Sequence, residues 1–147
     1  MDVERLLAEE ETGWRELHDV IVRMNDEQLQ RSGLTPQGWA AKDAMFHIGA
    51  WMADFADQLE RMRMGTFEER VDTVSDIDRQ NREWFELSQT LDLVTVKAGF
   101  ASARARMVHE FRSLTEVTAS AWGWFEESGP LHYRKHVEDL AAWAERG

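Results

Sequence analysis

The stretch that most clearly indicates the fold is WAAKDAMFHIGAWMADFADQLERMRMG, residues 39–65. Its large apolar residues recur at intervals of three and four, which is typical of the narrow apolar stripe of a helix in a bundle. They are Met45, Ile48, Met52, Phe55, Leu59 and Met62. Gly65, at the end of the stretch, is the kind of residue that terminates a helix. The sequence therefore predicts a helix from about Trp39 to Met64 with one side turned toward a core.

Similar periodicity indicates further helices on both sides of this stretch. A first helix is expected from about residue 3 to residue 24, followed by a short turn that Asn25 caps. A third helix begins near Ser75, and a fourth follows a break at which Thr90 is the expected N-cap. The third helix is expected to turn three residues inward: Ile77, Trp84 and Leu87.

The end of the chain predicts one more helix. The segment VTASAWGWFEESGP, residues 117–130, is expected to form a loop or a short distorted turn. Pro130 suits the first position of a helix, because its missing N–H would be unpaired there, so a last helix is expected from about Pro130 to Glu145. Together these patterns predict an all-α chain, one domain over residues 1–147, folded as a four-helix bundle with short extra helical turns.

Composition restricts the kind of partner that the chain can have. Acidic residues outnumber basic ones by 28 to 17, so the surface repels phosphate backbones and nucleic-acid binding is not expected. No polybasic segment, membrane-spanning apolar run or signal peptide is found, so we expect no membrane association and a cytoplasmic protein. The chain has no cysteine, which excludes disulfides, thiolate metal ligands and a protein thiol nucleophile.

Two histidines four residues apart, His132 and His136, lie at the start of the last helix. At 100° per residue they share a side with Leu140 and Trp143, so we expect them to face the core or a cleft. Two imidazoles at this spacing can bind one metal ion, but hydrogen-bonded core histidines would follow the same pattern. A catalytic zinc usually has three protein ligands. His47, at the edge of the apolar stripe of residues 39–64, is the best third candidate.

Four more residues are candidates for the surroundings of such a site. Asp43 lies one turn before His47 and either accepts a hydrogen bond from its second ring nitrogen or is a solvated acid in the first helical turn. Asn81 interrupts an apolar stripe, so it either lines a pocket or makes a hydrogen bond between helices. Trp51 occupies an inward or edge position. Trp124 either forms an aromatic lid, closes the end of the bundle or contacts a second subunit.

Three further polar residues are expected to lie outside the site. Glu10 interrupts the apolar stripe of the first helix and is expected to make a helix-packing hydrogen bond or to reach the surface. His18 lies at the flank of that stripe. His109 lies opposite the stripe of its own helix and is expected to be solvated.

At these motifs the chain resembles the DinB-like superfamily. WAAKDAMFHIGAW, residues 39–51, is similar to the second-helix signature of that superfamily, and HYRKHVEDLAAW, residues 132–143, resembles its last-helix motif. DIDRQN, residues 76–81, is similar to the branch that includes the ClbS/DfsB and maleylpyruvate-isomerase-like proteins. The resemblance spans nearly the whole chain in the order of its elements and implies a four-helix bundle.

The resemblance also implies a function. It implies a divalent metal ion, most often zinc or nickel, held by His47, His132 and His136, and it implies a homodimer. Some related proteins transfer or isomerise a substrate with a low-molecular-weight thiol, so a metal-dependent transferase or hydrolase acting on a small electrophile is expected. Others are resistance proteins that sequester a reactive metabolite without metal catalysis. The partner is therefore expected to be a small molecule, while the general base, the thiol and the substrate stay unassigned.

Overall fold

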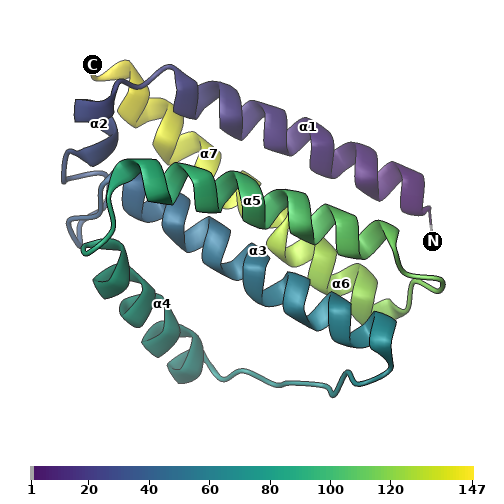
Figure 1. The fold of residues 1–147 in the computed structure, drawn as a ribbon. Helices are drawn as coiled ribbons and strands as arrows, with labels where there is room; N and C mark the ends of the chain where they lie inside the picture. The colour runs from purple at the N-terminus through teal and green to yellow at the C-terminus, as the bar shows by residue number, and fades with distance from the viewer. Residues whose placement is uncertain (1) are drawn as a thin grey trace.

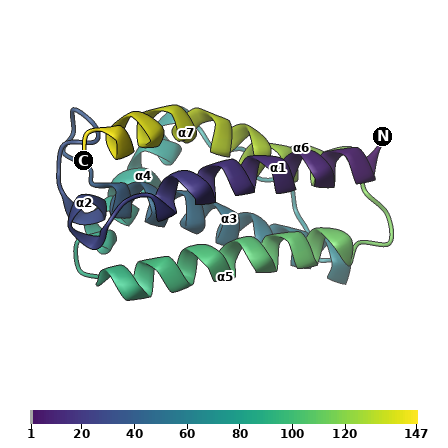
Figure 2. The same ribbon diagram turned by 90° about the horizontal axis from the view of Figure 1, so that it is seen from above.

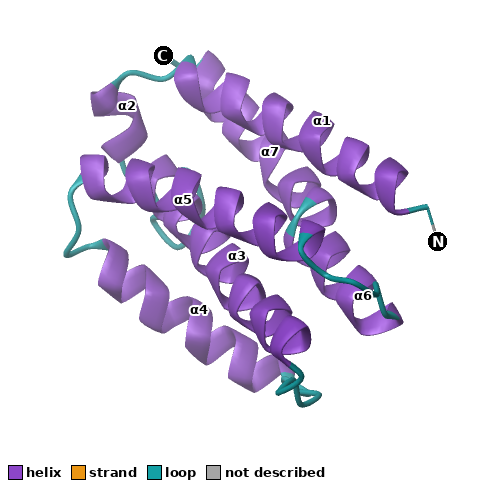
Figure 3. Ribbon diagram, turned by 45° about the vertical axis from the view of Figure 1, so that its right-hand side comes forward, coloured by secondary structure: helices purple, strands orange, loops and turns teal. Residues whose placement is uncertain are grey.

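The computed structural model describes residues 2–147, and it contains helices, turns and loops but no strand in that range (Figure 3). In chain order the helices are α1 (Val3–Val22), α2 (Asp26–Gln30), α3 (Ala41–Met64), α4 (Val74–Ser88), α5 (Leu93–Arg112), α6 (Ala119–Ser128) and α7 (Pro130–Glu145). The prediction of an all-α chain is therefore confirmed. None of the described helices is long and apolar enough to cross a membrane.

Capping side chains fix the beginning of most helices. In five cases the side chain accepts a hydrogen bond from the backbone N–H three residues further on, which pairs a donor that the helix leaves free. The caps are Asp2, Asn25, Thr73, Asp92 and Thr118. Two expected caps are wrong, because Thr73 caps α4 in place of Ser75 and Asp92 caps α5 in place of Thr90. The Thr90 hydroxyl instead donates to the carbonyl of Leu87 and closes the turn after α4.

Four rod-like units lie lengthwise beside one another: α1, α3, α5 and the consecutive pair α6–α7 (Figures 1 and 2). α3 is central and packs against α4, α5, α6 and α7, while α1 packs against α7. The short α2 is tied to the end of α7, because the Gln28 side chain donates to the carbonyl of Trp143 at 2.7 Å. Apolar side chains fill the space between the rods, among them Leu17, Ile48, Met52, Leu59, Met107, Phe111 and Phe125.

The prediction of a loop before the last helix is wrong, because residues 119–128 form α6. Gly123 suggested a break, but a glycine inside a helix costs only about 1 kcal/mol relative to alanine and is tolerated. The break falls at Gly129, whose backbone is not helical. A Cβ at Gly129 would lie 2.9 Å from the carbonyl oxygen of Phe125, so this sharp junction requires a glycine. α7 then begins at Pro130, as predicted.

α4 lies at the side of the molecule and packs against α3 (Figure 1). Leu87 is 48% exposed, so the expectation that it turns inward is wrong. Ile77 is 37% exposed but lines a cavity together with residues of α3 and α7, so it turns inward only in part. The physical reason is that α4 lies outside the group of long rods and has only one covered side. Trp84 does reach inward, and its ring meets the ring of Trp51 edge to face at 4.9 Å between centroids.

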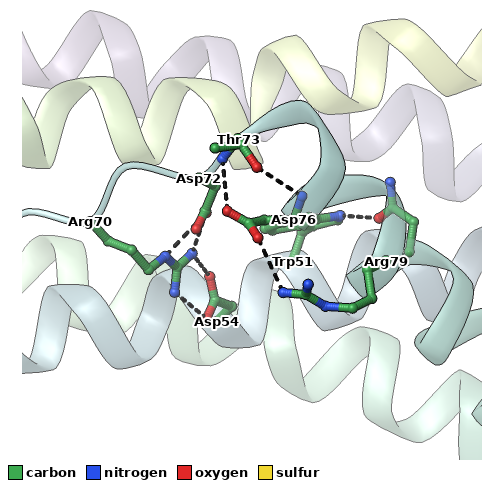
Figure 4. A network of polar contacts seen from close by, with 8 residues as sticks. Trp51, Asp54, Arg70, Asp72, Thr73, Asp76 and Arg79 are labelled. Carbon is green, nitrogen blue, oxygen red and sulfur yellow. Dashed lines mark hydrogen bonds and ion pairs between the residues drawn. The ribbon is translucent and has the colours of Figure 1, made fainter.

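A single arginine fixes the segment that joins α3 to α4. The Arg70 guanidinium donates to both carboxylate oxygens of Asp54 on α3, at 2.6 and 3.1 Å, and to Asp72 (Figure 4). Its other face lies 5.1 Å from the ring of Trp124 on α6. At the start of α4, Thr73 and Asp76 form a reciprocal capping box (Figure 4). These contacts tie the beginning of α4 to α3 and α6.

Candidate metal centre

Three histidines from two helices meet between α3 and α7. His47 comes from α3, while His132 and His136 come from successive turns of α7. The Nε2 atom of His132 lies 3.0 Å from Nε2 of His47 and 3.1 Å from Nε2 of His136. We call these three residues the metal triad, because one ligand atom from each lies within 4.8 Å of the others and the group can hold one metal ion.

Local sequence explains this convergence. Residues four apart lie one above the other on a helix, so His132 and His136 point to the same side of α7. The rotation of α7 is set by its buried residues Tyr133, Leu140 and Trp143, which face the core. His47 lies on the side of α3 that faces α7.

Burial keeps the metal triad neutral. Loss of hydration lowers the pKa of His47 to about 3, and the charge of His136 contributes in the same direction. Loss of hydration also lowers the pKa of His132 to about 2, with smaller contributions from His136, His47 and Lys135. The pKa of His136 is lowered by burial too, although Asp139 opposes the shift. Neutral imidazole is the form that binds a metal ion, so the environment favours a ligand set.

Two ring nitrogens of the metal triad have no hydrogen-bond partner. The Nδ1 atoms of His47 and His132 are buried and unpaired among residues 2–147. Histidines that serve only to pack a core are expected to pair their polar atoms, since an unpaired buried group costs about 1–3 kcal/mol. The metal triad converges through its Nε2 atoms, so a metal ion there would leave the same Nδ1 atoms unpaired. The unpaired nitrogens therefore do not distinguish a metal site from histidines that bond to one another in the core.

A cavity of about 330 Å³ opens beside the metal triad. Its other lining residues are Trp51, Phe55, Ile77, Asn81, Glu127, Ser128 and Lys135. The indole N–H of Trp51 donates to the Asn81 side-chain oxygen at 2.9 Å, which joins α3 to α4 at this point. Trp51 and Asn81 therefore both line the cavity. For Asn81 the sequence allowed either a pocket role or a hydrogen bond between helices, and the structure shows both.

Asp43 does not lie behind His47, and this prediction is wrong. Its carboxylate accepts hydrogen bonds from the backbone N–H of Ala40 at 2.7 Å, from the Ser88 hydroxyl at 2.5 Å and from the Gln89 amide at 2.6 Å. Asp43 is buried, so the alternative of a solvated acid is wrong as well. Its physical role is to start α3 and to anchor the end of α4.

The prediction of an aromatic lid formed by Trp124 is also wrong. Trp124 lies on α6 and does not line the cavity; its ring packs edge to face on Phe55, at 4.6 Å between centroids. It therefore supports one wall from behind. Trp122 is half-buried against the core and lines a different cavity, together with Arg5 and Leu6 of α1.

The remaining polar candidates lie away from the cavity, as expected. His18 and His109 are exposed. Glu10 is 1% exposed and makes the expected helix-packing contacts, because it accepts hydrogen bonds from Arg104 on α5 and from the Tyr133 hydroxyl on α7.

Sequence reasoning missed several cavity residues. Phe55 could have been found, because His47, Trp51 and Phe55 are spaced by four and share one side of α3. Glu127 could not have been found, because residues 119–128 were expected to form a loop, in which the directions of side chains cannot be predicted from spacing. Lys135 directly precedes a proposed ligand, but adjacent residues on a helix point about 100° apart, so spacing gave no reason to choose it.

Comparisons of the chain with protein-family models, with curated proteins and with solved structures found no match in any of the three. The resemblance to the DinB-like superfamily therefore stays a prediction, carried by the motifs of α3, α4 and α7.

Proposed function

We propose that this chain is a divalent-metal-binding protein of the DinB-like type, with its long rods arranged as a four-helix bundle. The observation that carries the proposal is the convergence of three imidazoles on one point, with His47 and His132 buried and His136 half-buried. Loss of hydration lowers the pKa of all three. The lengthwise arrangement of α1, α3, α5 and α6–α7 supports the bundle architecture.

The spacing of the metal triad fits a metal ion. Zinc–imidazole bonds of about 2.0–2.1 Å place neighbouring nitrogens about 3.3–3.4 Å apart in a tetrahedral site and about 2.9–3.0 Å apart in an octahedral one. The observed Nε2 separations of 3.0 and 3.1 Å lie at the octahedral end of this range. Zinc and nickel are the ions we propose, since imidazole suits both and no thiolate is present.

The proposed activity is that of a metal-dependent transferase or hydrolase acting on a small electrophile. A divalent ion would supply Lewis acidity, which lowers the pKa of a water or thiol ligand and polarises a substrate oxygen. The chain's own residues supply the binding site: Trp51 and Phe55 offer apolar surface, and Asn81 offers a polar group beside the metal triad. A low-molecular-weight thiol is the candidate cosubstrate that the resemblance implies, and the chain itself has no cysteine.

A second candidate function is sequestration of a small reactive metabolite without turnover. The observation that favours it is the apolar part of the cavity lining, formed by Trp51, Phe55 and Ile77. Such a surface retains an apolar ligand whether or not a metal ion takes part.

Turnover distinguishes the two functions. Zinc-loaded and metal-free protein are assayed with p-nitrophenyl acetate for hydrolysis, and with glutathione plus chlorodinitrobenzene for thiol transfer. We expect turnover that requires metal and that is lost in His47→Ala but kept in His109→Ala, whose exposed ring lies outside the site. Tight binding of the aromatic electrophile without turnover in either form would favour sequestration and contradict the enzyme.

A further inference from the structure

The lining of the cavity beside the metal triad is divided between apolar rings and hydrogen-bond donors. Trp51 and Phe55 on α3 and Ile77 on α4 provide the apolar surface. The volume of about 330 Å³ is at the small end of the range of about 300–1,000 Å³ found for ligand sites. The cavity therefore suits a compact ligand with one flat apolar part.

Asn81 presents N–H donors to this space. An indole N–H can only donate, so the Asn81 atom 2.9 Å from Trp51 Nε1 must be the amide oxygen. The NH₂ group of Asn81 is consequently directed away from that indole and can donate to a ligand. A ligand in the cavity would meet a fixed donor on the α4 side.

Lys135 adds a positive charge from α7. It is the one basic residue of the cavity lining, and its ammonium makes no ion pair within the described part of the chain. A free ammonium beside a cation site repels the cation, and a bound anion would relieve that repulsion.

We propose that the cavity binds a small monocarboxylic acid with a flat apolar body. The carboxylate accepts from the Asn81 amide and the Lys135 ammonium, and the body lies against Trp51 and Phe55. Glu127, the one carboxylate of the lining, repels a second negative charge and so disfavours dianions. This inference rests on the proposed function, because the metal triad lines the same cavity and the carboxylate is the group by which a small electrophile would be held there.

Calorimetric titration of the zinc-loaded full chain with phenylacetate, phenylacetamide and acetate tests the inference. We expect phenylacetate to bind about tenfold or more tightly than phenylacetamide, since a hydrogen bond to a charged group is stronger than one to a neutral group. Acetate, which lacks the apolar body, should also bind more weakly. Lys135→Ala should lose about tenfold in phenylacetate affinity, and Lys135→Arg should retain most of it. Arg134→Ala is the matched control, because it removes the same charge from an exposed neighbour that does not line this cavity.

The zinc content of each variant separates failure of this inference from failure of the metal site. If the chain holds zinc but does not distinguish phenylacetate from phenylacetamide, the inference is wrong and the metal site stands. Equal losses in Lys135→Ala and Arg134→Ala would overturn it as well. If the chain holds no zinc, the proposed function fails, and titration of the metal-free chain still decides whether Lys135 and Asn81 bind a carboxylate.

Discussion

Protons and a metal ion compete for the same ring nitrogens of His47, His132 and His136. Burial lowers the pKa of all three residues, so their imidazoles bind protons less strongly than exposed imidazoles do. An exposed histidine triad would release metal as the pH falls through about 6.5, the ordinary pKa of imidazole. We expect this triad to stay metal-competent to a lower pH.

The same shifts predict that the metal-free chain loses stability in mild acid. Between pH 6.5 and 3 an unfolded chain protonates its histidines while folded His47 stays neutral, so the unfolded state binds more protons and the free energy of unfolding falls as the pH falls. The slope contributed by each buried histidine is at most about 1.4 kcal/mol per pH unit. Urea denaturation at intervals from pH 7 to pH 4 measures it. His47→Asn should flatten the profile, and an unchanged slope in that variant would contradict the account.

Asp43 is predicted to matter for stability rather than for metal binding. Asp43→Ala leaves the Ala40 N–H and the Gln89 amide without this acceptor, while the Ser88 hydroxyl keeps the carbonyl of Phe85. Unfolding should therefore become easier by about 2–4 kcal/mol. Thermal and urea unfolding measure this loss, and Asp78→Ala, at an exposed site on α4, is the control. A variant that keeps its stability but loses metal would show that Asp43 supports His47 after all.

At the scale of the elements, three helices are joined by one buried polar contact. Glu10 on α1 accepts from Arg104 on α5 and, at 2.7 Å, from the Tyr133 hydroxyl on α7. Burial and the neighbouring Glu10 carboxylate raise the pKa of Tyr133, which therefore stays a donor. Because Tyr133 directly follows His132, this contact also fixes the rotation of α7 at the metal triad.

This contact predicts a large difference between buried and exposed ion pairs. Arg104→Met leaves the carboxylate of Glu10 buried without its cation and should lower the free energy of unfolding by about 3 kcal/mol. Arg5→Met removes the exposed pair with Glu9 and should change it by less than about 1 kcal/mol. Urea unfolding of both variants measures the contrast. Similar losses of unfolding free energy in the two variants would mean that the buried pair of Glu10 and Arg104 stabilises the fold no more than an exposed pair does.

The elements also show what sequence could and could not predict. α3 and α7 were predicted well, because each combines a clear apolar period with a strong end signal, Gly65 in one and Pro130 in the other. α6 was not predicted, because Gly123 between two tryptophans obscures the helical spacing of its apolar residues. Gly129 both ends α6 and precedes α7, so it did not indicate a separate helix. For Asp43, the spacing of four from His47 correctly predicted the side of α3 on which it lies. Its hydrogen bonds from Ser88 and Gln89 could not be predicted, because they join residues far apart in the sequence.

At the scale of the whole molecule, the homodimer stays a prediction. The described structure has an exposed, uncharged strip on the outer side of α5, formed by Val94, Ala98, Ala101 and Ala105. A water-facing helix in a chain with 31% charged residues would ordinarily carry charges there, so we expect a second copy to cover the strip.

Sedimentation equilibrium tests this expectation. The wild type should have about twice the monomer mass of 17.1 kDa. Val94→Glu should shift it to the monomer, while Val22→Glu, at an exposed site on α1, should not. A wild type that remains monomeric at high concentration would contradict the homodimer.

The proposed function requires that the metal triad hold a divalent ion. Elemental mass spectrometry of tag-free protein, challenged with Zn²⁺ or Ni²⁺ and dialysed, measures the metal content per chain. Two double variants are compared: His132→Ala/His136→Ala removes two proposed ligands, and His18→Ala/His109→Ala removes two exposed histidines. We predict one ion per chain in the wild type and in the second variant, and none in the first, with helical circular dichroism retained in all three. No bound ion in the wild type, or equal metal in both variants, would contradict the proposed metal centre.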